Sequence, residues 1–262
     1  MKECFDIPYS RLHADRRVID VFLPEASPNG AGIYWIHGGG FAGGSKAQWH
    51  EVCRHFCGLG YACASVEYRL APEWKFPAWV EDVRLGMSWF RRRAGEYGFS
   101  PGRVAAAGSS AGGYLALMLA TIAPDDDLAR SDELDGLETR PNTVAAYCPA
   151  TSMHEAKRWP SRAAYPKLMP APESAEPALY RAASVEDRIV GGEPPILFLH
   201  GTADELIPLS ESADLCERIT GAGGRAELVA LEGVGHGFGY GTRTDAQAAA
   251  IRHVERFLEQ CL

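Results

Sequence analysis

The stretch that most constrains the fold is AAAGSSAGGYLALMLA, residues 105–120. The strand-like segment RVAAAG runs directly into a G-x-S-x-G pattern at residues 108–112, and an apolar helical segment follows without a linker. A turn this sharp forces its central residue into a strained backbone conformation, and small residues on either side let strand and helix approach closely. The stretch therefore predicts a strand–turn–helix unit of an α/β protein, with Ser110 raised above the end of the strand.

The rest of the chain alternates between short strand-like segments and helical ones. The strand-like segments are rich in β-branched or aromatic residues, and Gly or Pro bounds most of them, as expected of strands buried on both faces. They are RRVIDVFLP, IYWI, YACASVEY, RVAAAG, TVAAYC, ILFLH and ELVAL. Apolar residues at helical spacing lie between them, in the sets Val52, Phe56 and Leu59; Val80, Val83, Met87 and Phe90; and Ile251, Val254, Leu258 and Cys261. This alternation predicts a mainly parallel central sheet with helices on both faces.

Length and composition predict one α/β domain spanning residues 1–262. With 262 residues, 46% of them hydrophobic and 23% charged, the chain can bury one large core. One stretch, residues 151–190, resists assignment, because it is rich in Pro, Ala and charged residues between TVAAYC and ILFLH. An insertion of this length in a compact domain is more often functional than a plain connection, so we expect 151–190 to form a lid or short cap.

Charge and cysteine usage limit the partners and the compartment. The formal charge of -8 and the pI near 5.5 argue against a nucleic-acid partner, because phosphate binding needs clustered Lys and Arg. No apolar run approaches the roughly 18 residues of a membrane helix, and the opening MKECFDIPYSRLHADRR lacks the apolar stretch of a secretory signal. The seven cysteines lack the paired spacing of a zinc site and are interpreted as reduced thiols. We therefore expect a cytoplasmic protein with no nucleic-acid and no membrane partner.

Ser110 is the expected nucleophile of a hydrolytic site. A serine hydroxyl attacks poorly until a base takes its proton, and that base needs an acid to orient it. In this fold class the acid and then the base follow the serine along the chain, each in a loop after a later strand. Asp204 in GTADELIP follows ILFLH, and His236 in EGVGHGFG follows ELVAL, so the order fits. Glu205 is the alternative acid, and His200, at the end of its own strand, is a weaker candidate base that suits the core better.

A glycine-rich loop within IYWIHGGGFAGGS, residues 33–45, predicts what would stabilise the charge that this attack creates. Attack on a carbonyl produces an oxyanion, which needs hydrogen-bond donors fixed in advance about 3 Å away. Backbone amides serve where no side chain blocks the approach and the loop can adopt unusual dihedral angles, hence the glycines. We expect the donors to be the N–H groups of Gly39, Gly40 and Ala111, with His37 bracing the loop. The G-x-x-x-x-G-K-[ST] order of a phosphate-binding loop is missing from the sequence.

Five ordered motifs resemble the hormone-sensitive-lipase branch of the α/β-hydrolase superfamily, and within it the small bacterial acetyl esterases. They are HGGGF (37–41), EYRLAPE (67–73), GSSAGG (108–113), GTADELIP (201–208) and GHGF (235–238), and together they span nearly the whole chain. The resemblance implies a serine carboxylesterase that needs no metal and no organic cofactor. It also implies the functional groups, a catalytic triad of Ser110, Asp204 and His236 and an oxyanion hole formed by the amides of Gly39, Gly40 and Ala111.

The sequence departs from that family in two places. Ser109 stands where the family usually has Asp in the serine turn, which we expect to alter loop hydrogen bonding more than chemistry. Only 36 residues precede HGGGF, barely enough for two strands, so we expect no N-terminal helical cap and look to 151–190 for the cover of the pocket. By the same resemblance, three residues of EYRLAPE hold the loops beneath the site, namely Tyr68, Arg69 and Glu73. The candidate pocket residues are Phe41, Trp49, Trp159, Tyr165, Leu168 and Phe238.

The expected activity is hydrolysis of short-chain acyl esters through a covalent acyl-enzyme, because a chain without that cap has little apolar surface for a long acyl group. By analogy with related enzymes, an acetylated or feruloylated carbohydrate is one expected natural substrate. The alternative is hydrolysis of a C–N bond, as in arylformamidases, which share the triad and a similar glycine loop. A more remote alternative is a non-enzymatic ligand receptor on the same scaffold, in which the catalytic histidine is lost, whereas GHGF retains it here. The oligomeric state, monomer or homodimer, stays open.

Overall fold

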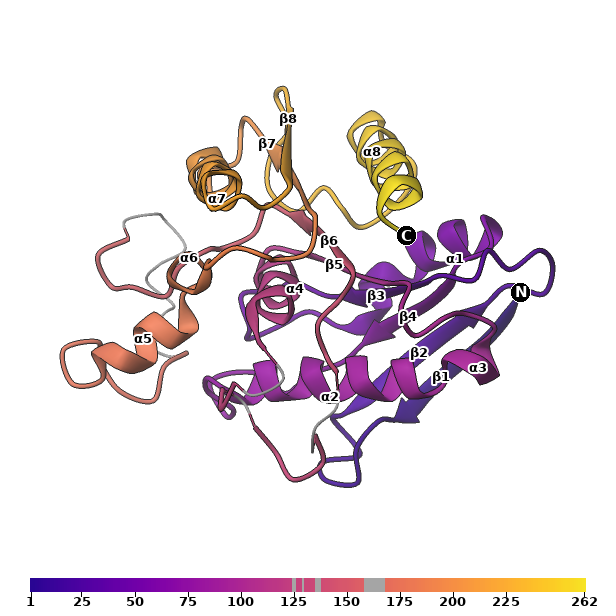
Figure 1. Ribbon diagram of the computed structural model, residues 1–262, viewed down its shortest axis with the longest axis horizontal. Helices are drawn as coiled ribbons and strands as arrows, with labels where there is room; N and C mark the ends of the chain where they lie inside the picture. Colours follow the sequence, from indigo (N-terminus) through magenta and orange to yellow (C-terminus); the bar gives the residue numbers. More distant parts are fainter. Residues whose placement is uncertain (124–125, 129, 135–137, 158–167) are drawn as a thin grey trace.

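The computed structural model describes residues 1–123, 126–128, 130–134, 138–157 and 168–262. Within these ranges eight strands form one sheet in the order β1-β2-β4-β3-β5-β6-β7-β8 (Figure 1). Strands β3 to β8 pair in parallel, whereas β2 is antiparallel to both β1 and β4. The prediction of a mainly parallel sheet is confirmed. The strand bounds are Lys2–Pro8 (β1), Val18–Leu23 (β2), Gly32–Ile36 (β3), Ala62–Val66 (β4), Val104–Ser109 (β5), Thr143–Tyr147 (β6), Ile196–Gly201 (β7) and Ala226–Leu231 (β8).

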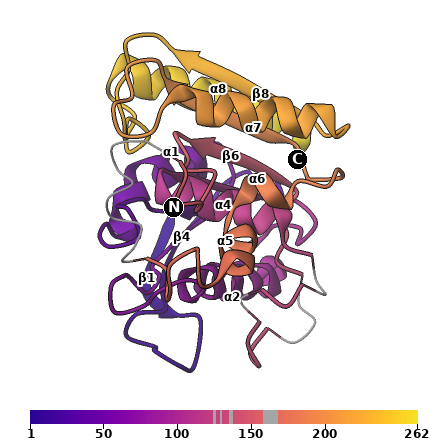
Figure 2. The same cartoon turned by 90° about the vertical axis from the view of Figure 1, so that its left-hand side faces the viewer.

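Helices cover both faces of the sheet (Figures 1 and 2). One face is covered by α1 (His50–Gly58), which follows the short 3-10 helix η1 (Lys46–Trp49), and by α8 (Asp245–Cys261). The other face is covered by α2 (Ala78–Arg92), α3 (Ala94–Tyr97), α4 (Ala111–Thr121), α5 (Pro177–Ala183), α6 (Val185–Arg188) and α7 (Leu209–Gly221). In the described part of the chain, no helix combines the length and the apolar character needed to cross a bilayer.

The central strands are hydrophobic throughout because both of their faces are covered. Along β3, Ile33 and Trp35 point into the core beneath α1 and α8, while Tyr34 and Ile36 point into the core beneath α2 and α4. Alternate side chains of one strand therefore supply two separate cores, as the geometry of a strand requires.

The helix patterns are mostly confirmed by burial. All four residues predicted to share a face of α2 are buried, and so are three of the four in α8, whose Cys261 is half-buried. The prediction for Leu59 is wrong, because this side chain is 48% exposed. Helix α1 ends at Gly58, so the position after it no longer follows the helical period that buries Val52 and Phe56.

The parallel register brings the carboxyl ends of six strands, β3 to β8, to the same edge of the sheet. Ile36 at the end of β3 pairs with Gly108 near the end of β5, and Ser109 of β5 pairs with Tyr147, the last residue of β6. Strand β6 pairs in turn with β7, and β7 with β8. The loops that leave β3, β5, β6, β7 and β8 therefore meet at one place.

The described part of 151–190 packs against α4. The Tyr114 hydroxyl of α4 donates a hydrogen bond of 2.6 Å to the carbonyl oxygen of Ala183 at the end of α5. His154 lies between two carboxylates, with its ring nitrogens 2.5 Å from Glu173 and 2.5 Å from Asp187. Burial opposes the imidazolium, but the hydrogen bonds to Asp187 and Glu173 prevail and raise the pKa of His154. These contacts fix the described residues of the segment, including α5 and α6, at one end of the molecule (Figure 1).

Candidate functional site

Ser110 lies at the turn between β5 and α4, in the strained conformation that the G-x-S-x-G pattern predicts. Its φ of 57° and ψ of -119° are rare for any residue with a side chain. A Cβ atom on Gly108 would lie 2.3 Å from the carbonyl oxygen of Gly112, and one on Gly112 would lie 2.0 Å from the carbonyl oxygen of Ile36. Only glycine fits at these two positions, so the pattern reflects close packing of strand against helix around Ser110.

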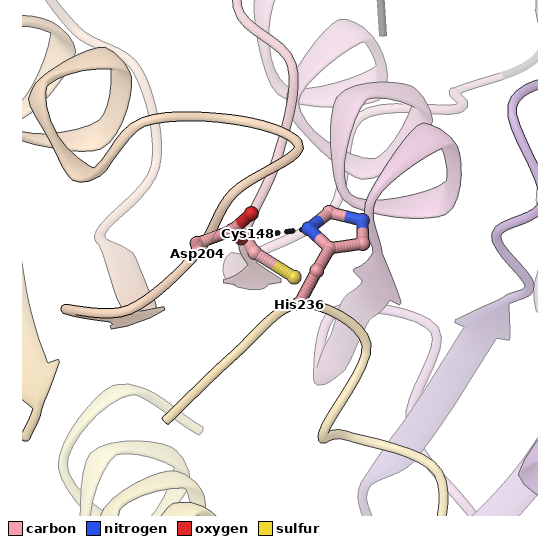
Figure 3. Close-up of side chains that lie close together, drawn as sticks. All are labelled: Cys148, Asp204 and His236. Atoms are coloured by element: carbon pink, nitrogen blue, oxygen red, sulfur yellow. Dashed lines mark hydrogen bonds and ion pairs between the residues drawn. The ribbon is translucent and has the colours of Figure 1, made fainter. Parts of the chain in front are cut away.

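Asp204 and His236 are joined by a short hydrogen bond, as the order along the chain predicts. The Nδ1 atom of His236 lies 2.7 Å from Oδ2 of Asp204, and Figure 3 shows the two side chains converging from the loops after β8 and β7. The other carboxylate oxygen of Asp204 accepts hydrogen bonds of 2.9 Å from the amides of Leu206 and Ile207. This leaves the Nε2 atom of His236 as the nitrogen available for proton transfer.

The pKa of Asp204 is held well below its usual range. Burial of the carboxylate opposes its charge, but hydrogen bonds with His200 and His236 and from the Ile207 amide outweigh that effect. His200 is itself fully buried, with Nδ1 2.8 Å from the Ser212 hydroxyl and Nε2 3.3 Å from Asp204. His200 therefore supports Asp204 from the core. Glu205, the alternative acid, is exposed.

The pKa of His236 moves in the opposite direction. Burial opposes its positive charge, but the hydrogen bond to Asp204 and the nearby Cys148 side chain prevail and raise the pKa of His236 to about 10. Cys148 follows β6 directly, is fully buried and has a positive φ of 37°. Figure 3 shows its sulfur beside the Asp204–His236 pair.

Cys148, Asp204 and His236 are also the side chains that come nearest to a metal site in the described residues, with ligand atoms within 4.8 Å of one another. Two of those atoms, on Asp204 and His236, already share a proton across 2.7 Å. A cation would have to displace that proton, so the arrangement suits proton transfer better than metal binding.

A pocket of about 310 Å³ opens onto Ser110 and His236. Its described lining consists of Gly39, Gly40, Phe41, Gln48, Ser109, Ser110, Ala111, Ala150, Leu206, Ile207, His236, Gly237 and Tyr240. The structure thus brings Ser110, His236 and all three predicted amide donors to the wall of one cavity.

The glycine loop after β3 adopts backbone conformations that favour glycine and leave the backbone uncovered. Gly39 and Gly40 have φ values of 115° and 61°, and a Cβ on Gly39 would lie 2.3 Å from the carbonyl oxygen of Gly43. A Cβ on Gly40 would meet nothing within 4 Å, so this residue faces open space. Amides exposed in this way can donate hydrogen bonds to an anion in the pocket.

His37 braces this loop from beneath, as expected. It is fully buried, its Nδ1 donates a hydrogen bond of 2.8 Å to the carbonyl oxygen of Gly38, and its ring stacks on Tyr68 at 4.2 Å. The Tyr68 hydroxyl donates to the carbonyl oxygen of His37 at 2.9 Å. Arg69 is buried and binds Asp82 of α2, whereas Glu73 is exposed. Tyr68 and Arg69 thus support the loops as the resemblance implied, and Glu73 lies at the surface.

The candidate pocket residues divide into three groups. Phe41 lines the pocket and stacks on Trp79 at 4.3 Å. Trp49, Leu168 and Phe238 are not part of the described lining. Trp49 and Leu168 are buried in the two hydrophobic cores, and Phe238 is half-buried against Tyr147. Large apolar residues near a motif fill the core as readily as they face a ligand, so a role of these three in substrate binding stays a prediction. Trp159 and Tyr165 lie outside the described residues.

Several residues that the sequence did not single out belong to this site, among them Gln48, Cys148 and Tyr240. Gln48 and Tyr240 line the pocket, and Cys148 contacts His236 from below. No motif marks them, because each reaches the site from a different loop through tertiary packing. Of the three, Tyr240 was the easiest to find from the sequence, because it lies four residues after His236 in the same glycine-rich loop.

Comparisons with known proteins agree with this geometry. The sequence model of the family described as BD-FAE matches residues 19–219, and that of the dienelactone hydrolase family matches residues 180–261. Esterase LipC of Mycobacterium tuberculosis is 30% identical over 229 residues, which are 84% of this chain and 56% of LipC. Carboxylesterase NlhH of the same organism is 38% identical over 94 residues, 36% of this chain and 30% of NlhH. The chain spans about half the length of the curated relatives that it matches over most of its own length.

Solved structures show the same fold over nearly the whole chain. Esterase 2 of Thermogutta terrifontis, phosphonylated by sarin, superposes with a TM-score of 0.83 at 26% identity and covers 97% of this chain and 93% of its own. The propionate-bound form of that esterase gives a TM-score of 0.81 at 26% identity, over 99% of this chain and 93% of its own. The family match, the fold and the five motifs agree, and the chain belongs to the BD-FAE family, within the hormone-sensitive-lipase-like branch of the α/β-hydrolase superfamily.

Proposed function

We propose that the protein is a carboxylesterase that cleaves short-chain acyl esters through an acyl-enzyme at Ser110. One observation carries the proposal. Ser110, in a strained turn, lines the same pocket as His236 and the residues of the three amides. The Nδ1 atom of His236 is hydrogen-bonded to the buried carboxylate of Asp204. This is the set of groups that acyl transfer needs, namely a nucleophile, a base with its orienting acid, and donors for an oxyanion.

The proposed mechanism assigns one role to each group. His236 Nε2 takes the hydroxyl proton of Ser110 as Oγ attacks the ester carbonyl carbon, and Asp204 holds His236 in the required tautomer. The amides of Gly39, Gly40 and Ala111 stabilise the negative oxygen of the tetrahedral intermediate. His236 then gives its proton to the departing alcohol, and water repeats the sequence to release the acid.

The size of the pocket supports a short acyl group. About 310 Å³ is near the lower end of ligand pockets, which run from roughly 300 to 1,000 Å³. Glycines and alanines form much of its wall, and Phe41, Leu206 and Ile207 are its large apolar side chains among the described residues. Esterase 2 of Thermogutta terrifontis has been solved with propionate and with butyrate, acids of the length that we propose here. The Gln48 amide at the wall suits an alcohol that bears hydroxyl groups, as in an acetylated or feruloylated carbohydrate.

We further propose that residues 1–262 act as one domain with 151–190 as its lid, and that the enzyme works in the cytoplasm. Helices α5 and α6 of this segment stand beside α4, whose first turn holds Ala111 of the pocket wall. All seven cysteines are free thiols, as is usual in a reducing compartment.

The test is hydrolysis of p-nitrophenyl acetate, butyrate, octanoate and decanoate by the wild type and by Ser110→Ala from the same preparation. We expect the wild type to prefer acetate or butyrate, and the variant to lose at least about 10⁴-fold in kcat, as removal of a nucleophile does. Fastest turnover of decanoate would contradict the short-chain proposal. Turnover of N-formylkynurenine without turnover of any ester would contradict the ester proposal in favour of C–N hydrolysis.

A further inference from the structure

The Tyr240 hydroxyl joins the glycine loop to the loop that carries His236. Its oxygen accepts a hydrogen bond of 2.7 Å from the amide of Gly38, the first glycine of the loop after β3. A Cβ on Gly38 would lie 2.4 Å from that hydroxyl oxygen and 2.6 Å from the carbonyl oxygen of Ser109. Tyr240 is four residues beyond His236, so one hydroxyl contacts the glycine loop from the loop that carries the proposed base.

A row of buried polar side chains continues from this hydroxyl toward His236. The Ser109 side chain is fully buried and lies close enough to Tyr240 to oppose the rise in the pKa of the phenol. Ser109 Oγ lies 3.7 Å from Cys148 Sγ, and the sulfur of Cys148 lies within 4.8 Å of a ring nitrogen of His236. Burial raises the pKa of Tyr240 to about 12, so the phenol keeps its proton at neutral pH while its oxygen accepts from the Gly38 amide.

The ring of Tyr240 is held in place by its neighbours. It packs on Trp49 with ring centroids 4.8 Å apart, and Trp49 Nε1 donates a hydrogen bond of 2.9 Å to the carbonyl oxygen of Ile36. Ile36 is the last residue of β3, from which the glycine loop begins. Both ends of the contact between Tyr240 and Gly38 are therefore anchored to the same strand.

We infer that Tyr240 is the positioning residue of the oxyanion hole. By fixing Gly38, its hydroxyl sets the direction of the two following amides, Gly39 and Gly40, before substrate binds. Donors that are already aimed at the developing charge lower the barrier, and removal of one such donor typically lowers kcat by about 10²–10³-fold. Loss of the Tyr240 hydroxyl leaves the donors present but less well aimed, so we expect a loss of about 10- to 100-fold. This inference rests on the proposed esterase function.

The test compares Tyr240→Phe with Tyr147→Phe. Tyr147 is a matched control, because its buried hydroxyl has no hydrogen-bond partner in the described structure and its ring packs on the same Trp49, with centroids 5.6 Å apart. For Tyr240→Phe we expect kcat for p-nitrophenyl butyrate to fall at least 10-fold, with KM within about threefold of the wild type. The Ki of an alkyl trifluoromethyl ketone, which presents an oxyanion when it adds to the serine, should rise in parallel with the loss of kcat/KM. Tyr147→Phe should match the wild type in all three values.

A second readout does not depend on catalysis. Hydrogen exchange followed by mass spectrometry should show faster exchange of the peptide that covers residues 37–45 in Tyr240→Phe, and unchanged exchange in Tyr147→Phe. If Tyr240→Phe does not fold, Ser109→Ala tests the same chain of contacts, with an expected loss of about 2- to 10-fold in kcat and no change in KM.

The outcomes separate the two proposals. If the wild type hydrolyses no ester but exchange at 37–45 accelerates in Tyr240→Phe, the esterase proposal fails while the positioning of the loop by Tyr240 stands. If Tyr240→Phe keeps kcat within twofold of the wild type, or if only KM rises, the inference is overturned while the esterase proposal is unaffected.

Discussion

At the scale of single residues, His236 is the group whose chemistry depends most on its neighbours. Burial opposes its charge, but the hydrogen bond that it donates to Asp204 and the nearby Cys148 side chain prevail, and the net effect is a pKa of about 10. A base must be neutral to take a proton, whereas a raised pKa keeps the imidazole protonated to higher pH. We therefore expect kcat/KM to rise with pH up to about 10 and to show no decline caused by His236 above that point.

The contribution of Cys148 can be separated by substitution. Cys148→Ala removes one of the two side chains that raise the pKa of His236, so the rising limb of kcat/KM against pH should move to lower pH. The measurement is the pH profile of p-nitrophenyl butyrate hydrolysis between pH 5 and 10. Cys63→Ala, at another buried cysteine on β4, is the control and should leave the profile in place. An unshifted profile for Cys148→Ala would show that the thiol does not influence His236.

At the scale of elements, a buried ionic cluster joins α2 to the segments before β2 and after β4. Asp82 of α2 is fully buried, and its carboxylate lies 2.7 Å from Nε of Arg17 and accepts a hydrogen bond of 2.8 Å from the backbone amide of Arg69. Arg69 then binds Glu81 on the same helix. The cluster supports the EYRLAPE segment, whose Tyr68 stacks on the histidine beneath the glycine loop.

Removal of the central charge should destabilise the fold. Asp82→Asn leaves two buried guanidinium groups without their main counter-charge, which typically costs about 3–5 kcal/mol. Urea unfolding should show this as a lower midpoint with an unchanged slope. Asp15→Asn is the control, because Asp15 pairs with Arg16 at the surface with an 80% exposed side chain, and we expect almost no change there. A midpoint for Asp82→Asn equal to that of the wild type would contradict the assigned role.

Strands could be predicted from the sequence where side chains on both of their faces are buried. Segments such as IYWI and ILFLH stand out because every side chain is buried, whereas β1 is an edge strand with mostly exposed residues and a register shift between Cys4 and Ile7. Ser110, Asp204 and His236 could be found because each follows a strand in a fixed order. Tyr240 and Cys148 could not, since their contacts depend on how loops from β3, β6 and β8 pack together. Whether a large apolar residue near a motif faces the pocket or the core depends on the same packing, and Phe41 lines the pocket whereas Trp49 is buried in the core.

At the scale of the whole molecule, the reactivity of the cysteine thiols depends on how closely the two cores are packed. Cys53, Cys57, Cys63 and Cys148 are buried, while Cys4, Cys216 and Cys261 are half-buried. Burial raises the pKa of Cys57 to about 12, which suppresses the reactive thiolate.

Titration with Ellman's reagent tests this packing. In the native protein we expect reaction only at the three half-buried thiols, and slowly, because burial also raises the pKa of Cys216 and of Cys261. In guanidinium chloride all seven should react at once. Fast reaction of a fourth thiol in the native state would show that one of the cores opens.

The hydrogen bond between Gly38 and Tyr240 joins residues 202 positions apart. A growing chain therefore cannot complete the glycine loop until almost all of it has been synthesised and β8 has docked beside β7. On dilution from denaturant, helical circular dichroism should recover before hydrolysis does, because helices form locally while this contact waits for the last strand. Nascent and half-folded chains would then be inactive, and only molecules that have finished folding would hydrolyse substrate.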